Sequence, residues 1–317
     1  MLDLVIVGGG PAGLATAIEA QRRSLKYVVL EKGCITNSIF HFPSQMVFFT
    51  TPELLEIGGM PLVSEREKPT RNEALKYYRK VVGALGLDVH QYEKVESIQQ
   101  TDAHRFRVRT PLADYATRNV VISTGYYDNP NMIGVPGENL PHVSHYYTEP
   151  YAFYGRDVVV IGGKNSAAEA ALDLFRGGAR VTLVHRGSEM GATVKYWVRP
   201  DIENRFKAGE IASFFNARVL EITPSAVRIL QGDVSRAIPA QQVFALTGYT
   251  ISTVFFDQLG VRYDPQTLRP DYDPETFETS VPGVYLAGSV VGGRINAEVF
   301  IENGRFHGET VVRAIGR

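Results

Sequence analysis

One structural unit occurs twice in this 317-residue chain: a β-rich run, a glycine turn, a helix-forming stretch and a second β-rich run. The first copy is LVIVGGGPAGLATAIEAQRRSLKYVVLEKG, residues 4–33, and the second is GRDVVVIGGKNSAAEAALDLFRGGARVTLVHRG, residues 155–187. Strand, tight turn, helix and strand in this order predict a parallel βαβ unit. Two copies therefore restrict the chain to an α/β fold with two related sheets.

The glycines of the first copy match the dinucleotide fingerprint G-x-G-x-x-G. Gly8 gives the tight turn, Gly10 lets the backbone approach a pyrophosphate, and Gly13 allows close helix packing. Glu31 follows the second strand, where an acid can accept hydrogen bonds from a ribose. The sequence predicts a dinucleotide site at Gly8, Gly10, Pro11, Ala12, Gly13, Glu31 and Lys32.

The second copy has a lysine in the middle of its fingerprint, with Gly162, Lys164 and Ala167 in the three places. A helix amino terminus still offers amides and a positive dipole end to a phosphate, and the lysine adds a point charge. His185 and Arg186 follow the next strand and suit a 2′-phosphate, whereas an NAD site usually has an acid there. A solvated Arg186 at a strand end is the alternative. We predict an NADPH site at Gly162, Gly163, Lys164, Asn165, Ser166, Ala167, His185 and Arg186.

The rest of the chain repeats the scheme. HRFRVRT, residues 104–110, and SAVRIL, residues 225–230, predict meander strands, and two later strands end in TGY at 124–126 and 247–249. Too little chain then remains for a third domain, so the strand and helix in 279–315 return to complete the first one. The sequence predicts two Rossmann-like dinucleotide-binding domains, the second inserted into the first: residues 1–126 with 250–317, and residues 127–249.

Charge and composition exclude several function classes. A formal net charge of −1 gives no basic field for nucleic acid or an anionic membrane. No apolar run approaches the roughly 20 residues that span a bilayer, and MLDLVIVGGG is a strand entering a turn rather than a signal peptide. Cys34 is the only cysteine, so the chain has no thiol pair. We expect a cytoplasmic protein with no metal site.

The paired fingerprints, the TGY strands and TSVPGVYLAGSV together resemble the thioredoxin-reductase-like flavoproteins. SIFHFP at 38–43, KPTRNEALKYYR at 68–79, IGGKNSA, VKYWVRP at 194–200 and VFIENGRFHG at 299–308 are similar to the bacillithiol disulfide reductase (YpdA or Bdr) family. The resemblance implies FAD in the first domain, NADPH in the inserted one, and a homodimer or homotetramer. It extends the cofactor sites to Ser38, Phe42, Thr124, Gly125, Gly248, Gly288, Ser289, Asn296 and Ala297.

Several of these assignments have alternatives. The Phe-rich loop at 38–50 either wraps the flavin or is ordinary core. Ser289 replaces the family's aspartate at the ribityl chain, and residues 296–297 are expected to open the closing helix. His307 on that helix either donates protons or is a packed or surface histidine. Residues 195–197 either flank the nicotinamide nucleotide or cover the joint between domains.

Two departures from related enzymes concern thiols. The C-x-x-C of thioredoxin reductases would fall at 146–149, which reads YYTE, so the usual route to a protein dithiol is excluded. Relatives with a thiol in the first fingerprint read G-G-G-P-C-G, whereas this chain has Ala12. Cys34 lies three residues past Glu31, near the expected adenosine end of FAD. We therefore assign no catalytic residue, and the chemistry is expected to centre on the flavin.

The function that the sequence favours is an FAD-dependent NADPH oxidoreductase, which passes hydride to flavin and on to a small acceptor such as bacillithiol disulfide. A ferredoxin or flavodoxin–NADP reductase is an alternative, although that branch usually extends further beyond its closing helix than Arg317. A flavin monooxygenase is another, suggested by VPGENLPHVSHY at 135–146. A nucleotide-sensing protein without turnover is the third.

Overall fold

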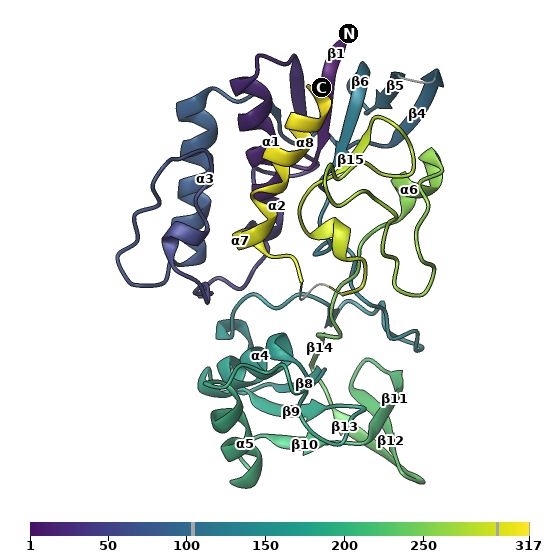
Figure 1. The fold of residues 1–317 in the computed structure, drawn as a ribbon. Helices are drawn as coiled ribbons and strands as arrows, with labels where there is room; N and C mark the ends of the chain where they lie inside the picture. Colours follow the sequence, from purple (N-terminus) through teal and green to yellow (C-terminus); the bar gives the residue numbers. More distant parts are fainter. Residues whose placement is uncertain (103–104, 296–297, 317) are drawn as a thin grey trace. The chain divides into compact units, whose positions relative to one another are not determined.

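The computed structural model describes residues 1–102, 105–295 and 298–316, and its contacts divide the chain into two compact units (Figure 1). The first unit comprises Met1–His41, Gln45–Asn129 and Tyr249–Arg317, and the second comprises Phe42–Ser44 and Pro130–Gly248. The described strands of each unit pair only with strands of the same unit. The predicted fold class is confirmed, because the main part of the second unit is inserted into the sequence of the first.

The described residues of the first unit form a sheet with strand order β3-β2-β1-β6-β5-β4, and β15 also pairs with β6. Its strands are β1 (Leu2–Val7), β2 (Tyr27–Leu30), β3 (Val89–His90), β4 (Ser97–Asp102), β5 (Arg105–Arg109), β6 (Asp114–Ile122) and β15 (Val284–Leu286). Its helices are α1 (Pro11–Arg22), α2 (Asn37–Phe40), α3 (Arg71–Leu85), α6 (Val254–Leu259), α7 (Ile301–Gly304) and α8 (His307–Ile315), with 3-10 turns at Pro52–Leu54 and Gly288–Gly292.

The parallel part of this sheet brings distant segments to one edge. Val7 is opposite both Leu30 and Ile122, and Leu286 is opposite Ile122. These four residues end β1, β2, β6 and β15, so the turns that follow the four strands meet at the same carboxyl edge. The return of the C-terminal strand to the first unit, which the sequence predicted, is confirmed by the pairing of β15 with β6.

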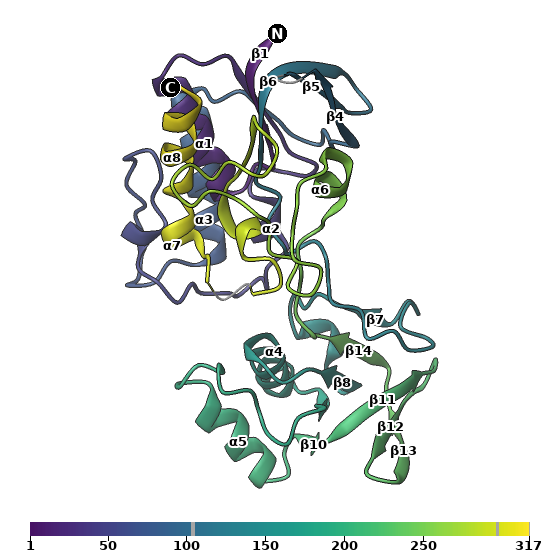
Figure 2. The same ribbon diagram turned by 45° about the vertical axis from the view of Figure 1, so that its right-hand side comes forward.

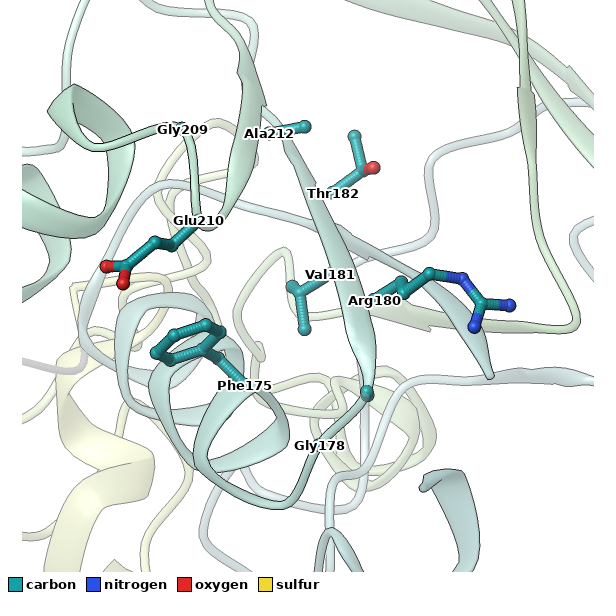
Figure 3. A pocket seen from close by; sticks show the side chains of 9 residues that line it. Phe175, Gly178, Arg180, Val181, Thr182, Gly209, Glu210 and Ala212 are labelled. Carbon is teal, nitrogen blue, oxygen red and sulfur yellow. The ribbon is translucent and has the colours of Figure 1, made fainter. Parts of the chain in front are cut away.

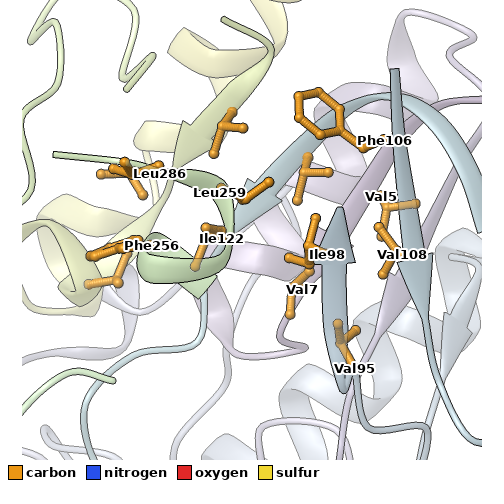
Figure 4. Packing of buried hydrophobic residues seen from close by; sticks show 14 of the residues in the cluster. Val5, Val7, Val95, Ile98, Phe106, Val108, Ile122, Phe256, Leu259 and Leu286 are labelled. Carbon is orange, nitrogen blue, oxygen red and sulfur yellow. The ribbon is translucent and has the colours of Figure 1, made fainter. Parts of the chain in front are cut away.

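Apolar side chains cover both faces of this sheet. On one face, Val5, Val7 and Ile122 pack with Phe256 and Leu259 of α6 (Figure 4). On the other, α1 and α8 lie side by side in both ribbon views (Figures 1 and 2). A Cβ atom at Gly308 of α8 would lie 2.6 Å from Thr16 of α1, so these two helices approach as closely as glycine permits.

The second unit has a parallel sheet with order β10-β9-β8-β14-β7 and a separate antiparallel sheet with order β11-β12-β13 in its described residues. Its strands are β7 (Val143–Ser144), β8 (Asp157–Ile161), β9 (Arg180–Val184), β10 (Ala212–Phe214), β11 (Ala217–Ile222), β12 (Ala226–Gln231), β13 (Val234–Pro239) and β14 (Gln242–Ala245). Its helices are α4 (Asn165–Arg176) and α5 (Arg199–Lys207), with a 3-10 turn at Tyr151–Phe153. The predicted meander strand at 225–230 is β12, and that at 104–110 is β5, whose described part begins at Arg105.

The closing helix differs from its prediction. Asn296 and Ala297, which were expected to open it, lie outside the described residues, but residues 298–300 are not helical and α7 begins at Ile301. The Asn303 side chain accepts from Phe300 N–H at 2.8 Å and donates to the Glu298 carbonyl at 2.8 Å. These bonds hold the segment before α7 in a turn. The prediction of one helix from residue 296 is therefore wrong, and two short helices, α7 and α8, stand in its place.

Candidate dinucleotide sites

The first glycine turn is fixed by contacts that only glycine allows. Gly8 has a φ of +113°, and a Cβ there would lie 2.5 Å from the Ser123 carbonyl oxygen. A Cβ at Gly13 would lie 2.0 Å from the Gly8 carbonyl oxygen, so α1 and β1 approach within backbone contact. The Ser123 hydroxyl, at the end of β6, bonds to the carbonyls of Val7 and Gly8 at 3.1 and 2.9 Å. Sequence reasoning missed this serine.

The middle glycine of the turn has open space instead. A Cβ at Gly10 would meet no protein atom within 4 Å. Gly10 is the N-cap of α1, and no side chain caps this 12-residue helix. The turn therefore offers helix amides and a cradle that a side chain would fill, which is the arrangement that a pyrophosphate requires. Pro11 and Ala12 complete the first turn of α1.

The carboxylate of Glu31 stabilises this turn by hydrogen bonds. It accepts from Gly9 N–H at 2.7 Å and from Gly33 N–H at 2.8 Å, and only 6% of the residue is exposed. Burial raises the pKa of Glu31, and the two amides act in the opposite direction. The acid predicted to contact a ribose thus also orders the loop around it. The neighbouring Lys32 pairs with Asp128 at 2.9 Å.

Cys34 lies in the same loop as Glu31. Its Sγ is 3.8 Å from the Asn37 Oδ1, and Gly33 before it is hydrogen-bonded to Glu31. Burial raises the pKa of the Cys34 thiol, and the charge of Glu31 acts in the same direction. A protonated thiol is a poor nucleophile, so this environment does not activate Cys34.

Other predicted flavin-site residues reach the same sheet edge after β6 and β15. Thr124 and Gly125 follow β6, and Gly125 has a φ of +66°. A Cβ at Gly125 would lie 3.6 Å from the Ser289 hydroxyl, and one at Gly288 would lie 2.7 Å from the Ala12 Cβ. Residues from three distant parts of the chain therefore converge beside the first glycine turn.

His307 is a packed residue. Its Nδ1 accepts from Gly288 N–H at 3.2 Å, and its ring stacks on Phe277 with centroids 4.1 Å apart. Burial lowers the pKa of His307 to about 4, so the imidazole is neutral near pH 7. Of the two interpretations of His307, this geometry favours packing over proton donation.

We predict that His307 makes the fold acid-sensitive. The unfolded chain binds its proton near pH 6.5 and the folded chain only near pH 4, so stability is full above pH 6.5 and falls as the pH drops toward 4. The loss is up to about 3 kcal/mol. His307→Asn keeps an acceptor for Gly288 N–H and should flatten this slope in urea unfolding curves. An equal slope in parent and variant would contradict the assignment.

The loop that follows α2 divides between the two units. Ser38 lies in α2 of the first unit, whereas Phe42–Ser44 belongs by its contacts to the second unit, where Ser44 N–H donates to the Thr148 carbonyl at 2.9 Å. Phe48 is core, with 5% exposure, while Phe40 and Phe49 are exposed. Among these three phenylalanines, the interpretation as ordinary core therefore holds for Phe48 only.

The second glycine turn has the same backbone plan. Gly162 has a φ of +153°, and a Cβ there would lie 2.5 Å from the Leu246 carbonyl oxygen and 2.9 Å from the Ala167 Cβ. A Cβ at Gly163 would lie 2.3–2.5 Å from three atoms of the His185 ring. The imidazole thus packs flat against the turn. Burial, together with the charge of Arg186, lowers the pKa of His185 and favours the neutral imidazole.

Two cations of this turn remain exposed. Lys164 is the N-cap of α4 and Arg186 follows β9, and neither has a charged partner within the described residues. Because Gly162 follows β8 and His185 follows β9, both cations lie at the carboxyl edge of the parallel sheet. Ser166 is exposed in the first turn of α4, and Gly248 follows β14 with a φ of +92°.

One residue of the segment aligned with the missing C-x-x-C, Tyr147, is packed in the core, whereas Thr148 and Glu149 are exposed. Tyr147 is 5% exposed, and its hydroxyl donates to Asp173 at 2.6 Å. Its ring packs edge-on against Phe244, with centroids 5.3 Å apart. Burial and Asp173 raise the pKa of Tyr147. This tyrosine is a structural residue of the second unit.

A surface pocket lies at the other end of the same strands (Figure 3). Phe175, Arg180 and Glu210 line it, and Arg180 is opposite Asp157 in the β8–β9 register, at the amino ends of both strands. Arg180 pairs with Asp157, and Glu210 pairs with Arg205. Because both charged side chains are paired, and because the glycine turn lies at the carboxyl edge of the sheet, this pocket is not part of the dinucleotide site.

Two features are absent from the described residues. No group of three or more His, Cys, Asp or Glu side chains there could hold a metal ion. No described helix is both long and apolar enough to cross a bilayer.

The geometry agrees with comparisons to known proteins. Residues 5–288 match the family described as pyridine nucleotide-disulphide oxidoreductase. The chain is 42% identical to the bacilliredoxin reductase Bdr of Bacillus subtilis strain 168, over 99% of the chain and 97% of the relative. Solved structures of bacillithiol disulfide reductase Bdr (YpdA) from Bacillus cereus and Staphylococcus aureus are 41% and 36% identical, with TM-scores of 0.96 and 0.94. Each covers 99% of this chain, with 98% and 97% of its own chain matched.

Proposed function

The chain belongs to the pyridine nucleotide-disulphide oxidoreductase family, and we propose that it uses FAD and NADPH to reduce a small disulfide of the bacillithiol type. The proteins named bacillithiol disulfide reductase, at 41% and 36% identity, support this substrate class. Ferredoxin–NADP reductases match at lower identity. The observation that supports this proposal most strongly is the pair of glycine turns, each followed by a helix without a capping side chain. The Glu31 carboxylate bonds to the first turn, and Arg186 lies at the same sheet edge as the second.

Each turn has a distinct part in the proposed reaction. In the first, the open space at Gly10 admits the FAD pyrophosphate, and Glu31 accepts from the ribose while holding Gly9 and Gly33. In the second, the α4 amides and Lys164 meet the NADPH pyrophosphate, and Arg186 forms a charge-assisted pair with its 2′-phosphate. These residues bind and orient the two cofactors.

The reaction balances without a protein thiol. NADPH, a proton and one disulfide give NADP⁺ and two thiols, and the disulfide bond breaks as it takes the two electrons. Bound flavin supplies the two-electron carrier between nicotinamide and acceptor. Ala12 has no nucleophile and Cys34 has no partner cysteine, so no redox-active pair in the chain stores electrons.

Cys34 is therefore expected to be dispensable. Cys34→Ser should leave NADPH-dependent disulfide reduction within a few-fold of the parent, because the thiol lies in the Glu31 loop with a raised pKa. Anaerobic NADPH titration of both proteins should stop at two electrons. If the variant loses acceptor reduction but still accepts electrons from NADPH, Cys34 takes part in the chemistry and this assignment is wrong.

We propose a cytoplasmic, homo-oligomeric enzyme. The single, unpaired cysteine and the nicotinamide donor fit a reducing compartment. Exposed apolar residues of the first unit, Leu54, Phe300 and Phe306, fit burial in a homodimer or homotetramer. Light scattering of the purified protein measures this assembly.

The test of the proposed function is steady-state NADPH oxidation with a panel of acceptors: bacillithiol disulfide, glutathione disulfide, ferredoxin, flavodoxin and a quinone. Bacillithiol disulfide should give the highest kcat/KM, with two thiols formed per NADPH. A highest value with ferredoxin or flavodoxin would instead support the electron-transfer reductase. NADPH oxidation that only oxygen sustains would reject both.

A further inference from the structure

Residues 190–195, which we name the clamp loop, lie between β9 and α5 and are fixed against the second glycine turn. Gly191 N–H donates to the Gly163 carbonyl at 2.7 Å. Met190 and Val194 are buried in the core of the second unit, with 2% and 4% exposure. The clamp loop is therefore anchored on the turn by its backbone and on the core by its side chains.

Asn165, the first residue of α4, bonds to the clamp loop through both the nitrogen and the oxygen of its side-chain amide. Its Nδ2 donates to the Thr193 carbonyl at 3.1 Å, and its Oδ1 accepts from Lys195 N–H at 2.9 Å. The guanidinium of Arg199 holds the other end of the loop by donating to the carbonyls of Met190 and Gly191. Asn165 thus joins the fingerprint helix directly to a segment about 30 residues later in the chain.

The clamp loop also positions the side chains of two lysines, Lys164 and Lys195. A Cβ at Gly191 would lie 3.5 Å from the Lys164 Cγ, so the stem of Lys164 runs along the bare backbone of the loop. The Lys195 ammonium pairs with Glu169 at 2.7 Å and lies 5.7 Å from the centre of the Trp197 ring. Movement of the clamp loop would shift both cations relative to the amides of α4.

We propose that Asn165 is a positioning residue for the nicotinamide nucleotide. By tying the clamp loop to the first turn of α4, it holds Lys164 where the pyrophosphate binds, while its own side chain remains occupied by Thr193 and Lys195. The inference rests on the proposed function. It assigns Asn165 a role through the loop, whereas the fingerprint alone suggests direct contact with phosphate.

Asn165→Ala removes both loop bonds and is the test variant. Calorimetric Kd for NADP⁺ should rise on the order of tenfold, because two hydrogen bonds that organise the site are lost. The KM for NADPH should rise by a similar factor while kcat at saturation stays within about twofold. NADH should be affected by the same factor as NADPH, since the loop does not contact the 2′-phosphate in this account. Ser188→Ala is the control, because Ser188 is exposed and makes no polar contact within the described residues.

A second variant keeps the test decisive if Asn165→Ala folds poorly. Gly191→Ala would place a Cβ 3.1 Å from the Gly163 carbonyl oxygen, so it should shift the clamp loop by a few tenths of an ångström and also raise the Kd. If both variants bind NADP⁺ with the parental affinity, or if kcat falls while KM is unchanged, this inference is wrong and the proposed function still stands. A parent protein that binds neither NADP⁺ nor NAD⁺ would remove the proposed function and this inference together.

Discussion

A Gly10→Val protein is expected to fold normally and to purify without bound flavin. A Cβ at residue 10 meets no protein atom within 4 Å, so the valine side chain begins in open space and extends into the pyrophosphate cradle. Loss of about two charge-assisted phosphate contacts, at about 1.5 kcal/mol each or more, should weaken FAD binding by on the order of 100-fold. Flavin absorbance after gel filtration, with circular dichroism as the check on folding, measures the effect.

Gly83→Ala is the matched control for this substitution. Gly83 lies within α3, and a Cβ there also meets nothing within 4 Å. Alanine in the helix interior should keep full flavin content and add about 0.5–1 kcal/mol of stability. A Gly10→Val protein that retains its flavin would show that the pyrophosphate lies elsewhere, and the assignment of the first unit would fail.

An Arg186→Ala protein is expected to lose its preference for NADPH. One charge-assisted pair with the 2′-phosphate contributes roughly 1.5–3 kcal/mol, so the KM for NADPH should rise by about 10- to 100-fold. The KM for NADH should change by less than about twofold, because NADH has no 2′-phosphate for the guanidinium to meet. Steady-state kinetics with both nucleotides measures this difference.

Arg156→Ala separates local recognition from a change in net charge. Arg156 is also exposed on the second unit, but it precedes β8 and therefore lies at the amino end of the strands. Its removal should leave both KM values unchanged. Equal rises for NADPH and NADH in the Arg186 variant would mean that Arg186 does not contact the 2′-phosphate.

The sequence predicted features that depend on local patterns. Each glycine turn is encoded within a single βαβ unit, where residue spacing alone sets the strand, turn and helix. The return of β15 to β6 followed from counting the chain that remained after the second TGY strand. Neither inference requires knowledge of which distant side chains are in contact.

Features that depend on long-range contacts were not predictable in the same way. The bond from Ser123 to the Gly8 carbonyl and the packing of His185 on Gly163 join residues far apart in sequence. Such contacts leave no spacing pattern. Gly163, the glycine directly before Lys164, is a sequence signal that could have indicated a side chain packed against the turn, and His185 is that side chain. The turn before Ile301 is a different, local case: the Asn303 side chain bonds to Phe300 and Glu298, three and five residues earlier, and no spacing motif marks this turn.

The anaerobic stoichiometry of one catalytic cycle tests the central claim most directly. The account predicts that one equivalent of NADPH bleaches the flavin absorbance of the purified protein, with no further uptake because Cys34 is the only cysteine. One equivalent of bacillithiol disulfide, added without oxygen, should then restore the absorbance and release two thiols. Flavin that NADPH cannot bleach, or reduced flavin that only oxygen can reoxidise, would contradict the account.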